Sequence, residues 1–179
     1  YYDMSDYNHT DPYQNEYIRK GNEYTDSILQ HTVKNSAEAL YYTAIRQMKN
    51  RQYNESIHSF KSVLAMHNIN IHAKAIANAC LGWMLYSQKN KTEGVHYLAQ
   101  AAIYDNENAT KENTALRDLG TILFQEGDIH HAIKYVQIAL KDANFYGARQ
   151  RKIEIENILP IIEQDRFNIV DQQRNTMSI

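Results

Sequence analysis

Proline, glycine and cysteine are scarce in this chain of 179 residues. Two prolines and six glycines are too few for the many tight turns of a β-sandwich or β-barrel. The single cysteine, Cys80, cannot form a disulfide within the chain, and its apolar surroundings favour a small core residue. No stretch approaches the roughly 18 apolar residues of a membrane span. These absences favour a soluble, largely helical protein.

The chain also lacks the signs of catalysis and of metal binding. Its formal net charge of −2 provides no global field for nucleic acid. It has no glycine-rich phosphate loop, no Gly-x-Ser-x-Gly motif and no Cys/His pairing for nucleophilic chemistry. The eight histidines include no His-x-x-x-His pair, and His130 and His131 point about 100° apart on a helix. We therefore expect no enzyme, no cofactor, no metal and no direct nucleic-acid binding.

What the sequence does contain is an internal repeat with a period of 38 positions across residues 37–150. Thr43-Ala44, Leu81-Gly82 and Leu119-Gly120 align, and the positions that follow them keep the same step. The other matched sets are Gln47, Leu85 and Leu123; Tyr53, Lys91 and Ile129; Ser56, Gly94 and Ala132; and Phe60, Leu98 and Val136. A fixed period of this size with helical patterning predicts an all-α fold, an α-solenoid of helical hairpins.

The repeat predicts one helical-repeat domain over residues 1–179, with hairpins at about 37–69, 70–107 and 108–143. Gly82 and Gly120 occupy the same repeat position, where a small residue lets two helices cross closely. Gly127 lies in the third turn and can adopt a positive φ there. Asp11-Pro12 predicts the start of an additional helix over about 12–31.

After the repeats, residues 144–166 predict a capping helix over the last hairpin. Pro160 is expected to kink or end that helix. Residues 167–179 are mostly polar and are expected to extend away from the domain. This pattern suits either a lead into a membrane helix beyond Ile179 or a disordered tail.

The third unit, with Leu119-Gly120, Leu123, Gly127-Asp128-Ile129 and Ala132, resembles a tetratricopeptide repeat. The second unit is similar but has Gly94 where that motif prefers alanine, and the first is degenerate. The period also exceeds the usual repeat of about 34 residues. The resemblance implies a superhelix that binds a partner on its concave face, without catalysis.

A narrower resemblance lies in residues 139–149 (Ala-Leu-Lys-Asp-Ala-Asn-Phe-Tyr-Gly-Ala-Arg), Lys152 and 158–163 (Ile-Leu-Pro-Ile-Ile-Glu). These strings resemble the SusR-like regulators of Bacteroides-type bacteria, which accompany polysaccharide-utilisation loci. That resemblance implies a periplasmic sensor region that precedes a membrane helix and a cytoplasmic part of a transcription regulator. The family's arrangement would place the membrane helix beyond Ile179.

The candidate binding surface is aromatic. If the first helix of each hairpin lines the concave face, its solvent side carries Tyr41, Trp83, Tyr86, Arg117 and Phe124. Trp83 and Tyr86 are three positions apart and share one helix face. Such a surface fits a peptide or protein partner, or an oligosaccharide that stacks on the rings. The alternative is that these aromatic side chains pack between helices as core.

The function expected from these observations is a non-enzymatic, periplasmic sensor or interaction module of a membrane-anchored transcription regulator linked to polysaccharide utilisation. The alternative is a cytoplasmic tetratricopeptide adaptor that binds a protein or peptide. The oligomeric state, the ligand and the direction of signalling are not encoded in any motif that we recognise.

Overall fold

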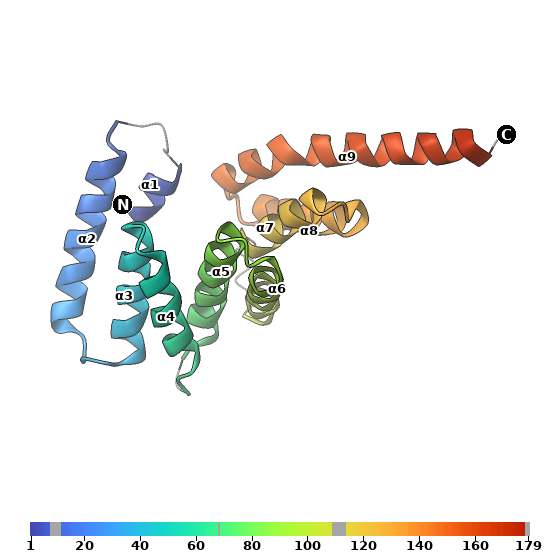
Figure 1. Ribbon diagram of the computed structural model, residues 1–179. Coiled ribbons are helices and arrows are strands. Elements are labelled where there is room, and N and C mark those ends of the chain that lie inside the picture. Colours follow the sequence, from blue (N-terminus) through green and yellow to red (C-terminus); the bar gives the residue numbers. More distant parts are fainter. Residues whose placement is uncertain (8–11, 68, 109–113, 178–179) are drawn as a thin grey trace. The chain divides into compact units, whose positions relative to one another are not determined.

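The computed structural model describes residues 1–7, 12–67, 69–108 and 114–177, and all regular structure in these ranges is helical (Figure 1). The predicted all-α fold of paired helices is confirmed. The chain forms two compact units, Tyr1–Ala77 and Asn78–Ile179. Helix α5 (Ile71–Ser87) leads from the first unit into the second.

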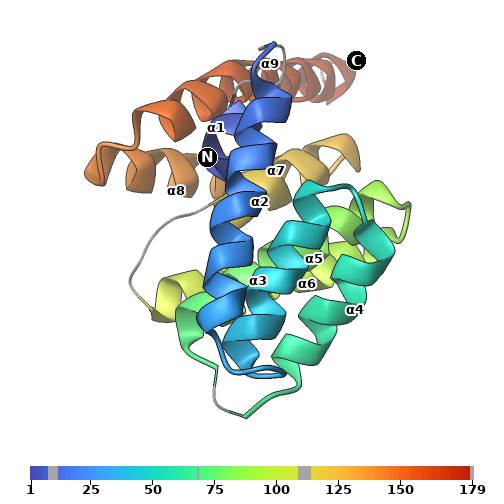
Figure 2. The same ribbon diagram turned by 90° about the vertical axis from the view of Figure 1, so that its left-hand side faces the viewer.

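Within its described residues, the first unit contains the complete helices α1 (Tyr2–Tyr7), α2 (Gln14–His31), α3 (Ala37–Lys49) and α4 (Tyr53–Leu64). Helices α2, α3 and α4 lie side by side, as Figure 2 shows. The second unit contains α6 (Lys91–Glu107), α7 (Thr114–Gln125), α8 (Ile129–Phe145) and α9 (Arg149–Met177). Helices α3 to α8 follow one another as three consecutive pairs, and α8 runs two residues past the expected end of the third repeat at about 143.

The turns inside the three hairpins share one backbone geometry. Arg51, Lys89 and Gly127 have positive φ angles of 62°, 67° and 86°. The next residue in each turn donates its amide N–H to a carbonyl five positions earlier, with N···O distances of 2.9, 3.0 and 2.8 Å. This is the Schellman ending of a helix, in which a left-handed residue reverses the chain. The positive φ expected at Gly127 is confirmed.

In the first hairpin, α3 and α4 are held by side chains that cross between them. The Ser36 side chain caps α3 by accepting from the amide of Ala39 at 3.1 Å. The buried Ser56 hydroxyl donates to the Ala44 carbonyl at 2.8 Å. Phe60 is completely buried. The small residues at the crossing thus allow a hydrogen bond from a side chain of α4 to the backbone of α3.

In the second and third hairpins, glycine allows an even closer approach. A Cβ atom built on Gly82 would lie 2.9 Å from the carbonyl oxygen of Gly94 and from the amide nitrogen of Leu98. A Cβ on Gly120 would lie 2.6 Å from Cγ2 of Val136. Real Cβ atoms do not approach other atoms so closely, so both positions require glycine for this packing. The expected close crossing at Gly82 and Gly120 is present.

The N-terminal segment contains a helix that the sequence pattern does not predict. Residues 1–10 show no clean hydrophobic period, yet Tyr2–Tyr7 form α1. The physical reason is tertiary: the Tyr2 ring packs on Gly21 of α2, where a Cβ would come within 2.4 Å of the ring. The expected cap Asp11 lies outside the described residues, and Tyr13 occupies the N-cap position of α2.

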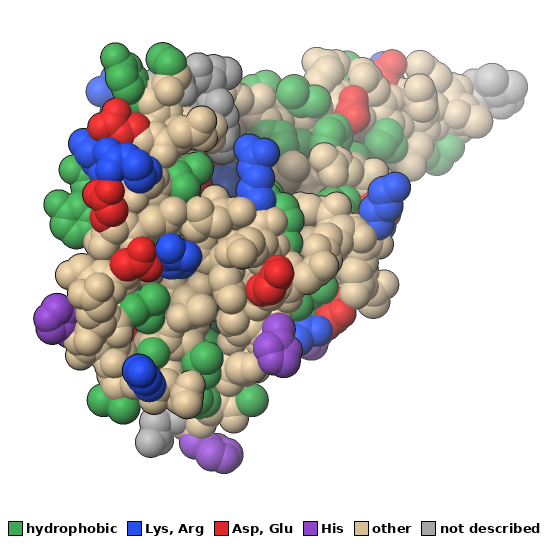
Figure 3. Space-filling model, turned by 60° about the vertical axis from the view of Figure 1, so that its left-hand side comes forward, with side chains coloured by type: hydrophobic (Ala, Val, Ile, Leu, Met, Phe, Trp, Pro, Cys, Tyr) green, Lys and Arg blue, Asp and Glu red, His purple; other side chains and the backbone are tan. Residues whose placement is uncertain are grey.

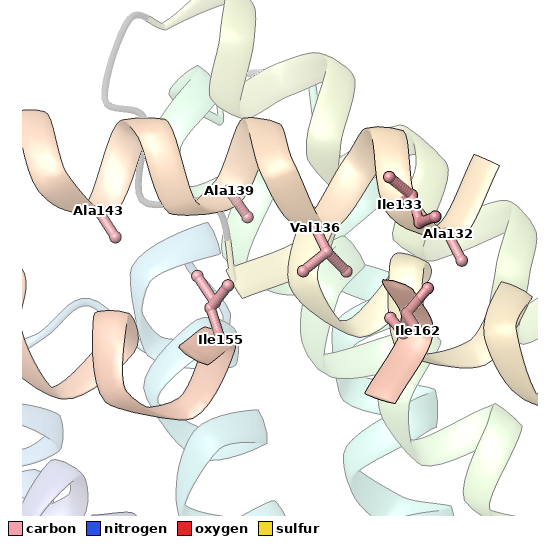
Figure 4. Packing of buried hydrophobic residues seen from close by; sticks show 7 residues of the cluster. All are labelled: Ala132, Ile133, Val136, Ala139, Ala143, Ile155 and Ile162. Atoms are coloured by element: carbon pink, nitrogen blue, oxygen red, sulfur yellow. The ribbon is translucent and has the colours of Figure 1, made fainter. Parts of the chain in front are cut away.

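One core cluster of the second unit lies between α8 and α9. Figure 4 shows Ile155 and Ile162 of α9 pointing toward small and β-branched side chains of α8. Both isoleucines are at most 2% exposed. The contributing residues of α8 are Ala132, Ile133, Val136, Ala139 and Ala143. This packing supports the expectation that the last helix covers the final hairpin.

The bounds expected for that last helix are wrong at both ends. Residues 144–146 complete α8 and its C-cap, and Gly147 at φ 63° separates α8 from α9. Helix α9 then continues through Pro160 to Met177, so there is no break at residue 166. Pro160 is exposed, which leaves its lost backbone hydrogen bond to be replaced by water, while Ile162 holds the helix on α8.

Candidate binding site

A groove of about 410 Å³ lies in the first unit between α1, α2 and α3. Its lining is largely aromatic and aliphatic and comprises Tyr1, Tyr2, Gly21, Tyr24, Thr25, Ile28, Tyr42 and Ile45. Tyr24 and Ile28 come from one face of α2, four residues apart. Because residues at this spacing share a helix face, α2 presents both side chains to the same groove. We call these eight residues the tyrosine groove.

Two tyrosines form a stacked wall of the tyrosine groove. The rings of Tyr1 and Tyr24 lie 5.5 Å apart between centroids, at an interplanar angle of 19°. Tyr24 is 62% exposed and Tyr1 is 46% exposed. Large aromatic rings that stack and yet remain open to solvent offer a flat, polarisable surface for another apolar or planar group. The two stacked rings thus form an open aromatic wall of the tyrosine groove.

Tyr2 forms the floor and is fixed by hydrogen bonds. Its hydroxyl donates to Asn22 Oδ1 at 2.8 Å and accepts from the Thr25 hydroxyl at 3.3 Å. Burial raises the pKa of the Tyr2 phenol above its ordinary value, so the hydroxyl stays protonated and remains a donor. The side chain of Asn22 also bonds Asn50 at the end of α3, at 2.9 Å. The floor is therefore tied to both flanking helices.

Cations border the tyrosine groove. The Lys20 ammonium lies 5.5 Å from the Tyr1 ring centroid, and the Lys49 ammonium lies 5.7 Å from the Tyr2 ring centroid. Both lysines also pair with carboxylates, Lys20 with Glu16 and Lys49 with Asp6. Figure 3 shows positive and negative side chains in small mixed clusters on this side of the molecule. The apolar lining, rather than a field of one sign, therefore defines what the groove can bind.

Of the five residues expected to form a binding surface, Tyr41 and Phe124 take part in packing. The Tyr41 ring meets the buried Phe60 ring edge-on, with centroids 6.3 Å apart. Phe124 of α7 packs against the core between α8 and α9. The alternative interpretation, in which the aromatic side chains serve as core, describes these two residues well.

Trp83 and Tyr86 share a face of α5, as their spacing predicts, but differ in their surroundings. Trp83 is 46% exposed. Tyr86 packs against the cluster of Leu98, Leu119 and Ile122, and its hydroxyl lies 3.2 Å from Gln125 Oε1. Tyr86 is therefore anchored by its ring and by its hydroxyl. Trp83 alone of this pair presents a large open aromatic surface.

Arg117 is held in an ion-pair network between α7 and α9. Its guanidinium donates to Asp118 at 2.7 and 2.9 Å and also pairs with Glu154. Burial raises the pKa of the Asp118 carboxyl, opposed by the neighbouring positive charge of Arg117. An arginine that is committed to two carboxylates in this way orients α9 on α7. Tyr41 belongs to the first unit, whereas Trp83, Tyr86, Arg117 and Phe124 belong to the second. A common binding surface formed by these five residues therefore remains a prediction.

Within the described ranges, no group of three or more His, Cys, Asp and Glu side chains is arranged to hold a metal ion. Cys80 is half-buried. No helix among the same residues is long and apolar enough to cross a membrane.

The sequence pattern does not reveal the tyrosine groove, because its parts are far apart in the chain. Tyr1 and Tyr2 precede the repeats, and Tyr42 and Ile45 belong to α3. A signal was nevertheless present, since fourteen tyrosines is a high number for this length and several of them lie in the first 42 residues. Periodicity along the chain does not report contacts between α1 and α2.

The pairing of consecutive helices, the Schellman turns and the close glycine crossings define a tetratricopeptide-like helical-repeat protein. A solved structure described as "Crystal structure of MamA" has a similar fold, with a TM-score of 0.50 and 16% identity over 80% of this chain and 87% of that chain. At this identity the likeness concerns the fold alone. A search of curated proteins finds no significant match.

The family model for the SusR N-terminal TPR domain matches residues 1–157. The chain therefore belongs to this family. The match includes the whole tyrosine groove, the three hairpins and the first part of α9. It confirms the resemblance seen in residues 139–149.

Proposed function

We propose that this chain is the extracytoplasmic sensor region of a membrane-anchored transcription regulator linked to polysaccharide utilisation. The observation that carries the proposal is the family match over residues 1–157. Helical-repeat domains of this kind act as interaction modules and hold no catalytic centre of their own. The membrane anchor would follow Ile179, and the regulated genes would serve polysaccharide uptake or breakdown.

The partner proposed for the sensor is a protein segment that places an apolar side chain in the tyrosine groove. The lining of stacked rings with Ile28 and Ile45 favours such a side chain, because burial of apolar area is its main source of binding energy. The groove offers few polar atoms, and those of Tyr2 are already hydrogen-bonded within the chain. An oligosaccharide would need several hydrogen-bonding groups in addition to stacking, so it is the less suitable occupant.

Two matched variants of the full-length regulator test this proposal. Tyr24→Ala removes an exposed ring of the groove wall, and Tyr146→Ala removes a tyrosine that is 49% exposed in the second unit. Transcription of the regulated polysaccharide-utilisation genes is measured with and without the inducing polysaccharide. We expect Tyr24→Ala to reduce induction strongly, while Tyr146→Ala leaves it unchanged.

Equal induction in both variants and in the unmodified protein would contradict a role for the groove. Titration of the purified chain with oligosaccharides of the inducing polysaccharide distinguishes the two ligand classes. If the oligosaccharides bind and Tyr24→Ala abolishes that binding, the occupant of the groove is a sugar and not a protein segment. If neither variant nor the inducing polysaccharide changes transcription through this chain, the alternative, a cytoplasmic adaptor that binds a protein or peptide, would be favoured.

A further inference from the structure

The second half of α9 carries a stripe of exposed side chains. Figure 1 shows this part of α9 running past the N-terminal end of α8. From Glu163 to Met177, every residue but the half-buried Asp171 is exposed. Phe167 is 66% exposed, Val170 55% and Met177 83%. Exposed apolar side chains in a row on a helix commonly mark an interaction surface.

The spacing of this stripe is that of a coiled-coil seam. Its members alternate in steps of three and four residues, namely Pro160, Glu163, Phe167, Val170, Arg174 and Met177. We call these six residues the outer stripe. At about 100° per residue they cluster on a face roughly 100° around the helix from Ile155 and Ile162, which pack on α8. The outer stripe and the α8 contact are thus separate faces of α9.

The outer stripe is complementary to itself when two copies run antiparallel. If the two-fold axis passes midway between Phe167 and Val170, each Phe167 meets the Val170 of the other copy. In the same register, Glu163 lies opposite Arg174. Pro160 lies opposite Met177. Each half of the pair therefore contains three layers of facing side chains, two of them apolar and one that joins an acid to a base. This is the arrangement of the a–d′ layers in an antiparallel coiled coil.

We propose that the outer stripe is a self-association surface, through which two copies of this chain pair their α9 helices antiparallel. A parallel pair in register would place Glu163 against Glu163 and Arg174 against Arg174, which like-charge repulsion opposes. Arg174 also pairs with Asp171 of its own helix at 2.8 Å, but its side chain remains 76% exposed and can reach a second partner. The inference does not rest on the proposed function.

The proposed pair is small. Because the outer stripe has only six residues, we expect the pair to bury less than the ~1,200 Å² of a stable interface, and we therefore expect a weak association that depends on concentration. Such an association suits a domain whose local concentration is raised by tethering, because linkage makes the second contact effectively intramolecular.

Sedimentation velocity of the 1–179 chain over about 1 µM to 1 mM tests the pairing. Arg174→Glu places two acids in each charged layer and should raise the dissociation constant about tenfold or more. Glu163→Arg places two bases there and should act alike. The double variant, with Glu163→Arg and Arg174→Glu together, should recover the association of the unmodified chain. Asp165→Lys, a reversal of charge on the opposite side of α9, is the matched control and should change little.

A mixture adds a second readout. Chains with Glu163→Arg alone and chains with Arg174→Glu alone should each associate at least tenfold more weakly than the unmodified chain, and mixing them should restore its association. Helical content, followed by circular dichroism, verifies that each variant is folded. A monomeric unmodified chain at all concentrations would overturn the proposal and leave the stripe to another partner. A dissociation constant that either single reversal leaves unchanged, or that the double variant fails to restore, would overturn it as well.

Discussion

Single small residues set how closely the helices of this protein pack. Gly82 faces the backbone of α6, since its added Cβ would meet the Gly94 carbonyl oxygen and the Leu98 amide nitrogen at 2.9 Å. Gly94, where the repeat pattern prefers alanine, has a matching reason: its added Cβ would lie 2.8 Å from the Tyr86 amide nitrogen. The glycine that looked like a departure from the motif is thus part of a tighter crossing.

The close crossing predicts the sign of the change in unfolding free energy when Gly82 is replaced by alanine. In an open helix position, Gly→Ala stabilises by up to about 1 kcal/mol. Gly82→Ala should instead destabilise by about 1–3 kcal/mol, because backbone atoms cannot rotate away. Gly120→Ala is the matched variant and should cost less, since its nearest contact is the Val136 side chain. Urea midpoints measure both, and a gain in stability for Gly82→Ala would contradict the packing.

At the scale of an element, the three helical hairpins share the conformation of their turns, although the residues in those turns differ. The three left-handed positions are occupied by Arg51, Lys89 and Gly127, although only glycine adopts that conformation without steric cost. The hydrogen bonds that follow them are nearly identical. The packing of each helix pair requires this turn. Arg51 and Lys89 therefore adopt the left-handed conformation in spite of its steric cost.

Lys89→Gly should therefore stabilise the protein by about 0.5–1 kcal/mol, the relieved strain being partly offset by the greater freedom of glycine in the unfolded chain. Gly127→Ala is the reciprocal change and should destabilise by about 1 kcal/mol. Thermal or urea unfolding of both variants is the measurement. A loss of stability in Lys89→Gly would mean that the lysine side chain matters more than its backbone angle.

Helix α9 continues past residues that locally favour a helix end. Pro160 and the polar composition after residue 166 favour an ending, and the helix continues to Met177. Packing of Ile155 and Ile162 on α8 stabilises the helix on both sides of the proline. Tertiary contacts thus outweigh the loss of one backbone hydrogen bond, which a sequence rule cannot weigh.

For the whole molecule, the repeat was sufficient to predict the helical class, the pairing of consecutive helices and the close crossings at Gly82 and Gly120. These features depend on neighbours in sequence, which periodicity reports. The candidate site depends on contacts that periodicity does not report. Tyr2 of α1 packs on Gly21 of α2, and the Tyr41 ring packs edge-on against the ring of Phe60. Whether an aromatic side chain at helical spacing is core or surface follows from which neighbour covers it.

The central proposal is that this helical-repeat domain senses outside the cytoplasm. The most direct test is a topology reporter inserted after Ile179 in the full-length gene. Alkaline phosphatase folds into an active enzyme only where its disulfides form, outside the cytoplasm. We predict high phosphatase activity for this fusion and no fluorescence for a green fluorescent protein fusion at the same position. A fluorescent, phosphatase-inactive pair would place the domain in the cytoplasm and contradict the proposal.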